Sequence, residues 1–182
     1  MAKVLDKGNI FSPEDTLSFL DKVLQGLEAC WEKRIVHRDI KPANIMLRTN
    51  GSPVIVDFGL SRHLELTSLT PTEYPGAIGT LLFAPPELLS YTKNDIDSKT
   101  DLYSLGITVY MMMTGQHPYI NLRNPPKNVM YALMNTAAIA PHLLNPAIPE
   151  SLSRFVLRLM KRNRVDRPRD AAQARSKLSE LS

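Results

Sequence analysis

One polar stretch, residues 37–44 with the sequence His-Arg-Asp-Ile-Lys-Pro-Ala-Asn, constrains the fold of this chain more than any other. Pro42 fixes its own φ and favours an extended Lys41, so the stretch is a loop and not a helix. Short apolar, β-prone runs lie on both sides of it. A polar loop between two rigid elements commonly presents catalytic groups. Asp39, Lys41 and Asn44 are therefore candidates for a base, an anion-binding group and a metal ligand.

A β-hairpin is predicted directly after this loop. Asn50-Gly51 lies between the apolar runs 45–47 and 54–56, and this dipeptide is a strong turn signal between strands. The hairpin would bring Asn44 and Asp57 to neighbouring strand ends. Both side chains offer the hard oxygen ligands that Mg²⁺ prefers. The spacing therefore predicts a metal site shared by the loop and the end of the second strand.

At this point the residues carry a family resemblance. The 37–44 loop and Asp57-Phe58-Gly59 resemble the H-R-D-x-K-x-x-N catalytic loop and the D-F-G motif of eukaryotic-type (Hanks-type) protein kinases. The resemblance extends over residues 5–181. Lys41, together with Thr80 in a G-T-x-x-[FY] motif, points to serine/threonine and not tyrosine kinases. It implies transfer of the ATP γ-phosphoryl group to Ser/Thr hydroxyls of a protein substrate, with ATP and Mg²⁺ as cofactors.

The resemblance also implies a role for each residue near the loop. Asp39 would accept the proton of the substrate hydroxyl, and Lys41 would neutralise charge on the transferring group. Thr80 would bond to both of them. Mg²⁺ would be held by Asn44 and Asp57. The residues expected to contact the nucleotide are Lys41, Asn44, Met46 and Asp57.

Further residues match structural or regulatory positions of the family. His37, Phe58 and Asp101 match its regulatory spine, and Gly59 frees the backbone after the metal-binding aspartate. Asp101 would also hold the backbone of the catalytic loop, although an ordinary acid in a first helical turn is an equally good interpretation without the family. Arg38 matches the arginine that binds a phosphate on the activation segment, and Thr72 is the candidate for the phosphorylated residue. Glu87 and Arg167 match an ion pair of the family. Without the family, Arg167 could also be a surface charge.

Helical patterns dominate the rest of the chain. Ser12-Pro13 begins a helix that reaches Trp31, and residues 98–101 cap a second helix that is apolar nearly all round and ends at Gly115. Further helices are predicted near 128–135, 152–160 and 171–181. The fold class is therefore α+β and mostly α-helical, with roughly six helices and two to four short strands.

The predicted organisation is one domain over 1–182, corresponding to the C-terminal lobe of a protein kinase domain. It has a hinge-like leader at 1–11, the catalytic loop at 37–44 and an activation segment at 57–87. The sequence contains no G-x-G-x-x-G cluster and no V-A-I-K lysine, which in the family belong to the N-terminal lobe. We therefore expect the N-lobe to be supplied in cis or in trans. The alternative is a non-catalytic C-lobe fragment or pseudokinase that acts as a protein-binding module.

Composition indicates which partners and which cellular compartment are expected. The excess of 22 basic over 18 acidic residues gives a net charge of +4, which does not call for nucleic acid as a partner. Cys30 is the single cysteine, so no internal disulfide can form and a reducing compartment is favoured. No apolar run approaches the roughly 20 residues of a membrane span, so a cytoplasmic location without membrane contact is expected. We interpret His63, His117 and His142 as surface or turn residues.

Overall fold

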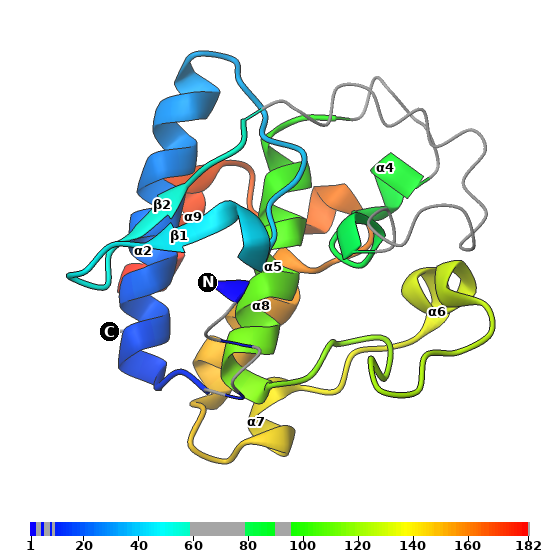
Figure 1. Ribbon diagram of the computed structural model, residues 1–182. Coiled ribbons are helices and arrows are strands. Elements are labelled where there is room, and N and C mark those ends of the chain that lie inside the picture. The colour runs from blue at the N-terminus through cyan, green and yellow to red at the C-terminus, as the bar shows by residue number, and fades with distance from the viewer. Residues whose placement is uncertain (3–4, 6–7, 9, 59–78, 90–95, 182) are drawn as a thin grey trace.

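The computed structural model describes residues 1–2, 5, 8, 10–58, 79–89 and 96–181. Helices make up most of this part, and its two strands form one small sheet (Figure 1). The expectation of a mostly helical α+β chain is therefore confirmed. Gly59, His63 and Thr72 lie outside the described residues, as does most of the predicted activation segment.

Helix α2, Pro13–Glu32, begins where the sequence predicted. The Ser12 hydroxyl accepts a hydrogen bond from the Asp15 backbone N–H at 3.0 Å, and Pro13 occupies the first turn, where its missing N–H is not needed. The helix buries one face, which carries Thr16, Phe19, Leu20, Val23, Leu24 and Leu27. This amphipathic pattern seats α2 against the core and directs its C-terminal end towards the 37–44 loop.

Helix α5, Ser98–Thr114, runs through the centre of the molecule and is buried on nearly all sides (Figure 1). It ends at Gly115, whose φ of 67° is the left-handed conformation that glycine adopts without strain. The predicted N-cap needs a correction. Asp97 is the capping residue, and its carboxylate accepts the Lys99 backbone N–H at 2.8 Å. Asp101 does not cap the helix, and its side chain makes other hydrogen bonds, which are described below.

Of the remaining helices, two pack against α5 and one packs against α2 (Figure 1). Helix α8, Glu150–Leu159, packs against α5, and α9, Ala171–Ser179, packs against α2. The predicted helices near 128–135 and 171–181 correspond to α6, Val129–Asn135, and to α9. Two four-residue helices are also described, α4 at Pro86–Leu89 and α7 at Pro141–Leu144.

The predicted hairpin is also present. A short 3₁₀ turn, Pro42–Asn44, leads into β1, Ile45–Leu47, which pairs antiparallel with β2, Pro53–Ile55, so that Ile45 lies opposite Ile55. The hairpin packs on α2. The ladder continues with a hydrogen bond from the Val56 N–H to the Asn44 carbonyl oxygen at 2.9 Å. Asn44 and the residues after β2 are thus neighbours, as the sequence spacing predicted.

His117 was predicted to be a surface or turn residue, and it lies in the irregular segment after α5 but is buried there. Only 6% of it is exposed. Nε2 lies 2.9 Å from the Leu82 carbonyl oxygen and Nδ1 lies 3.2 Å from the Tyr119 backbone N–H, so Nε2 donates and Nδ1 accepts. This arrangement requires the neutral imidazole. Burial lowers the pKa of His117 below its usual value, and the hydrogen bond to Leu82 offsets this only in part.

This burial predicts a loss of stability in mild acid. Below pH about 6.5 the unfolded chain protonates His117 and the folded chain does not, so the free energy of unfolding falls as pH falls, by up to about 1.4 kcal/mol per pH unit. The variant His117→Gln should show a shallower decline between pH 7 and pH 5 in urea titrations. Parallel pH curves for the two proteins would contradict this assignment.

Two helical glycines predict opposite effects of the same substitution. A Cβ at Gly106 of α5 would lie 2.9 Å from Leu159 Cβ and 2.7 Å from Met160 Cγ, whereas a Cβ at Gly26 of α2 would meet only Ile55 Cδ1, at 3.7 Å. Gly106→Ala should lower the free energy of unfolding by about 1–3 kcal/mol because α5 and α8 must separate. Gly26→Ala should raise it by roughly 0.5–1 kcal/mol through helix propensity. Urea denaturation of both variants checks this, and equal effects would be inconsistent with the close crossing of α5 and α8.

Candidate active site

A buried carboxylate on α5 holds the backbone of the 37–44 loop. Asp101 is fully buried, and its Oδ1 accepts the Arg38 backbone N–H at 2.8 Å. Its Oδ2 accepts the backbone N–H of His37 and the indole N–H of Trp31, both at 2.9 Å. Arg38 has a φ of 67°, a conformation that a non-glycine residue keeps only when its surroundings stabilise it. The carboxylate supplies that stabilisation.

The electrostatic environment of Asp101 balances two opposing effects. Complete burial raises the pKa of this carboxyl because it disfavours the charged form. The three donated hydrogen bonds favour the charged form and lower the pKa, so they offset part of the burial effect. If any one donor is removed, burial disfavours the charged carboxylate more strongly. The loop and the carboxylate therefore depend on each other.

His37 connects the loop to the end of strand β2. Its Nε2 lies 2.9 Å from the Val56 carbonyl oxygen and donates to it, while Nδ1 accepts the Asp39 backbone N–H at 3.3 Å. The ring packs edge-on against Phe58, with centroids 4.8 Å apart. His37 and Phe58 were predicted to share a spine with Asp101, and these contacts bring all three together through His37.

Four polar side chains converge beside this loop. Asp39 Oδ2 lies 2.8 Å from Lys41 Nζ and accepts a hydrogen bond from Asn44 Nδ2 at 2.8 Å. Lys41 Nζ also donates to Thr80 Oγ1 at 2.7 Å. Asn44 Nδ2 makes a second bond, to the Asp39 carbonyl oxygen at 2.9 Å. The structure thus brings together Asp39, Lys41, Asn44 and Thr80, which lie up to 41 positions apart in the sequence.

The second oxygen of Asp39 is left without a partner. Oδ1 is buried and accepts no hydrogen bond within the described part of the chain. An unpaired buried polar atom is unfavourable and uncommon in native proteins, so it calls for an explanation. An active-site base is one such explanation, because its acceptor must be kept for the substrate.

The oxygen atoms suited to a cation come from Asn44 and Asp57. The Asn44 amide nitrogen is used on Asp39, which leaves its Oδ1 as an acceptor. Asp57 follows β2 with a φ of 61°, and its side chain is exposed and makes no hydrogen bond to another described residue. Among the described residues no group of three or more His, Cys, Asp and Glu side chains is placed to hold a metal. Carboxylate and amide oxygens are ligand types that Mg²⁺ takes, and one or two such groups suit this ion because it keeps waters and phosphate oxygens as its other ligands.

Met46 lies on the open side of the hairpin. Its neighbour Ile45 points into the core and is fully buried, whereas Met46 is 59% exposed. Phe58 and Ile35 are also exposed apolar side chains near this loop. The predicted contact of Met46 with a nucleotide stays a prediction, and the side chain is accessible for it.

An ion pair far from the loop supports the same core. Arg167, fully buried, donates from Nη1 to Glu87 Oε1 at 2.6 Å and from Nη2 to Glu87 Oε2 at 2.9 Å. Its remaining N–H groups reach the carbonyl oxygens of Lys99, Lys161 and Arg162. The expected pair is thus present, and Arg167 is not a surface charge. It joins α4, the start of α5 and the segment after α8.

The residue that sequence reasoning missed is Trp31. The sequence placed it only at the end of the helix that begins at Ser12-Pro13, but its indole N–H is one of the three donors to Asp101. The available signal was the position of a polar-tipped aromatic at the last turn of a helix, six residues before His37. Buried Trp N–H groups normally find a partner, so an acceptor in the core was to be expected.

Comparison with known proteins agrees with this geometry. Residues 1–177 match the protein kinase domain family. The chain is 33% identical over 160 residues to a probable serine/threonine-protein kinase of Streptomyces coelicolor, covering 88% of this chain and 23% of that protein. It is 30% identical over 167 residues to the serine/threonine-protein kinase PknB of Mycolicibacterium smegmatis, covering 92% and 26%. A probable serine/threonine-protein kinase of Clostridium perfringens is 32% identical over 160 residues, covering 88% and 22%.

The chain therefore belongs to the protein kinase family, and within that family it is similar to Hanks-type serine/threonine kinases. It spans about a quarter of the length of these relatives. Among the described residues, no helix is both long enough and apolar enough to span a bilayer.

The Trp31–Asp101 hydrogen bond predicts that removal of the Trp31 donor will loosen the 37–44 loop. Trp31→Phe keeps an aromatic ring but removes the donor, and it should lower the free energy of unfolding by about 1–3 kcal/mol. Hydrogen exchange of the His37 and Arg38 amides should accelerate, because both donate to the same carboxylate. Tyr131→Phe, at an exposed site, is the control. Unchanged exchange at His37 and Arg38 would refute the positioning role.

Proposed function

We propose that this chain is the catalytic lobe of an enzyme that transfers the γ-phosphoryl group of ATP to Ser/Thr hydroxyls of proteins. One observation carries the proposal. Asp39 Oδ2 is held by Lys41 and Asn44, while the buried Oδ1 has no partner among the described residues. A carboxylate fixed by one oxygen and unpaired at the other is suited to accept the proton of a substrate hydroxyl that reaches it.

Each residue of this cluster then has a distinct task. Asp39 orients the hydroxyl and takes up its proton, a contribution of about 10²–10⁴-fold for a general base. Lys41 lies between Asp39 and Thr80 and places positive charge where the transferring group gathers negative charge. Thr80 fixes the ammonium group of Lys41 by accepting its hydrogen bond. Because this transfer depends mainly on positioning and charge, no covalent intermediate on the protein is needed.

The cofactors proposed for this site are ATP and Mg²⁺, which the protein kinase family uses in general. Asn44 Oδ1 and the Asp57 carboxylate would hold the cation, which when bound neutralises phosphate charge. The exposed Met46 would contact the adenine side of the nucleotide. Gly59, which follows in the D-F-G motif, lies outside the described residues.

We further propose that a phosphate-covering N-lobe completes the site, in cis or in trans. The domain organisation stays as predicted from the sequence, with residues 1–11 as a hinge-like leader, 37–44 as the catalytic loop and 57–87 as the activation segment. Supporting this, three apolar side chains near the site are exposed: Ile35 just before the loop, Met46 on β1 and Phe58 just after β2. A further lobe that covers this side of the molecule would remove them from water.

Regulation through the activation segment is part of the same proposal. The Arg38 side chain is exposed and makes no hydrogen bond to another described residue. A phosphate on Thr72 would add about −1.5 to −2 charges opposite this guanidinium. Thr72 itself lies outside the described residues. We place the reaction in the cytoplasm, where Cys30 stays reduced, with a protein as substrate and no nucleic acid or membrane as partner.

The decisive experiment measures phosphoryl transfer from radiolabelled ATP to a generic Ser/Thr substrate such as myelin basic protein. The chain is tested together with the N-lobe, encoded upstream or added in trans. Asp39→Asn should lower the rate by roughly 10²–10⁴-fold, since it keeps the shape and removes the base. Glu150→Gln, at an exposed site on α8, is the matched control and should leave the rate unchanged.

Equal rates for wild type and Asp39→Asn would reject catalysis by this lobe. The alternative function, a non-catalytic lobe or pseudokinase that binds proteins, would then be favoured. It predicts no Mg²⁺-dependent nucleotide binding even in the presence of the N-lobe, which isothermal titration calorimetry measures directly.

A further inference from the structure

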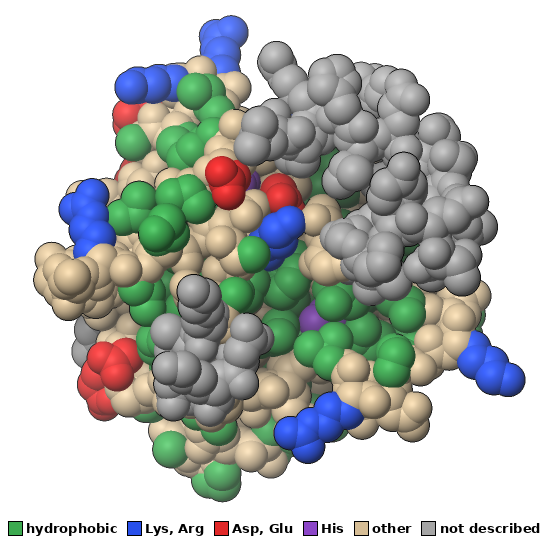
Figure 2. Space-filling view, in the orientation of Figure 1, with side chains coloured by type: hydrophobic (Ala, Val, Ile, Leu, Met, Phe, Trp, Pro, Cys, Tyr) green, Lys and Arg blue, Asp and Glu red, His purple; other side chains and the backbone are tan. Residues whose placement is uncertain are grey.

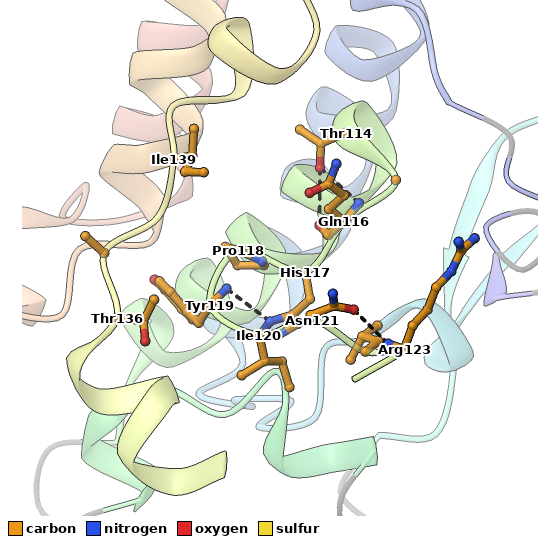
Figure 3. A pocket seen from close by; sticks show the side chains of 13 residues that line it. Thr114, Gln116, His117, Pro118, Tyr119, Ile120, Asn121, Arg123, Thr136 and Ile139 are labelled. Carbon is orange, nitrogen blue, oxygen red and sulfur yellow. Dashed lines mark hydrogen bonds between the residues drawn. The ribbon is translucent and has the colours of Figure 1, made fainter. Parts of the chain in front are cut away.

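A cavity of about 760 Å³ lies away from the catalytic loop, between the residues that follow α5 and those that follow α6. We call it the α6 pocket and define it by Tyr119, Ile120, Arg123, Thr136 and Ile139. Figure 3 shows the two walls, with Tyr119 and Ile120 on one and Thr136 and Ile139 on the other. Its size is typical of cavities that bind a ligand or several peptide residues. None of its lining residues belongs to the proposed phosphoryl-transfer site.

Among the described residues that line the pocket, Arg123 is the one basic side chain, and none is Asp or Glu. The sequence contains no Asp or Glu between Asp101 and Glu150, a stretch that includes every residue lining the pocket. Arg123 lies at the rim, and Lys127 is exposed four positions later. Without a carboxylate on the same segment, these cations attract negatively charged groups. The pocket is therefore complementary to an acidic ligand.

The two walls are held in place by one arginine. The Arg162 guanidinium lies over the Tyr119 ring, 5.1 Å from its centroid. The same side chain donates hydrogen bonds to the carbonyl oxygens of Leu133 and Thr136. It thus ties the wall that follows α6 to the aromatic wall that follows α5, and it adds positive charge behind Tyr119. A cavity fixed in this way loses little conformational freedom when a ligand binds.

The wall that follows α6 can pair with a peptide backbone. Residues 136–140 have no regular structure, and both Thr136 and Ala140 have extended backbone angles. The backbone N–H groups of Ala137, Ala138 and Ile139 donate no hydrogen bond to any other described residue. An extended segment with unpaired N–H groups is a ready partner for a second extended chain.

Two of the side chains that line the pocket are apolar and exposed. Ile139 is 54% exposed and Leu122 is 48% exposed, and Tyr131 of α6 is also solvent-exposed. Figure 2 shows hydrophobic side chains gathered around a histidine on this face of the molecule, with basic side chains towards the edge. Such a patch beside a cavity marks a protein-binding surface more often than a solvated face.

We propose that the α6 pocket docks an extended segment of a partner protein that carries an apolar residue flanked by Asp or Glu. The apolar side chain enters between Tyr119 and Ile139, the acidic groups face Arg123, and the backbone carbonyl groups accept from the free N–H groups of residues 137–139. This docking does not depend on phosphoryl transfer. It applies whether the chain is a catalytic lobe or a binding module.

The test uses two degenerate libraries of fluorescein-labelled eight-residue peptides with a central Leu or Phe. The flanking positions are Asp or Glu in one library and Lys or Arg in the other. Fluorescence anisotropy should show at least roughly tenfold tighter binding of the acidic library, and added salt should weaken that binding. Arg123→Glu and Ile139→Asp should each weaken it by roughly tenfold. Lys177→Glu on α9 is the matched charge-reversal control and should bind like wild type.

Two results would overturn the proposal. The first is equal affinity for both libraries, or equal affinity of Arg123→Glu and wild type for the acidic library. The second is that the acidic library does not bind, and that sedimentation velocity shows a concentration-dependent dimer which Ile139→Asp abolishes. The occupant of the pocket would then be a second copy of this chain. Both substituted side chains are exposed, and circular dichroism confirms that each variant is folded before binding is measured.

Discussion

The bonding of Asp101 is the interaction on which the rest of the structure depends. Its buried carboxylate joins the core helix α5 to the backbone of the 37–44 loop and to the last turn of α2. Burying a charge is unfavourable unless donors surround it, and here the donors are groups whose positions matter most. The left-handed Arg38 persists because this carboxylate accepts its N–H. The direction of Asp39 and Lys41 follows from that backbone conformation.

A second buried charge stabilises the opposite side of α5. Arg167 binds Glu87 through both of its terminal nitrogens and lies over the Tyr103 ring, 4.8 Å from its centroid. Replacing one partner of such a pair typically lowers stability by about 3–5 kcal/mol, because the other charge is left buried. Helix α5 is therefore held by charge on two sides and by apolar packing against α8. The 37–44 loop and Thr80 come from distant parts of the chain, and both are positioned relative to this helix.

Local patterns predicted the elements well where one residue type has one physical role. Ser12-Pro13 begins α2, Gly115 ends α5, and Asn50-Gly51 lies in the hairpin turn because each satisfies a backbone requirement that is nearly independent of tertiary structure. The same reasoning failed for the N-cap of α5 and for His117. A capping oxygen can come from any of several neighbouring polar residues, and an isolated histidine shows no periodic pattern that would indicate burial.

The sequence by itself determined which residues could form a site: a loop with Asp39, Lys41 and Asn44, a hairpin that returns the chain to Asp57, and motifs that resemble those of the protein kinase family. Only the tertiary structure decided how these groups are held. It showed that Trp31 is a donor to Asp101, that Asp39 has one paired and one unpaired oxygen, and that residues after α5 and α6 enclose an acid-free pocket. The physical reason is that periodicity and motifs report each element separately. A hydrogen bond across 70 residues exists only once the elements have packed.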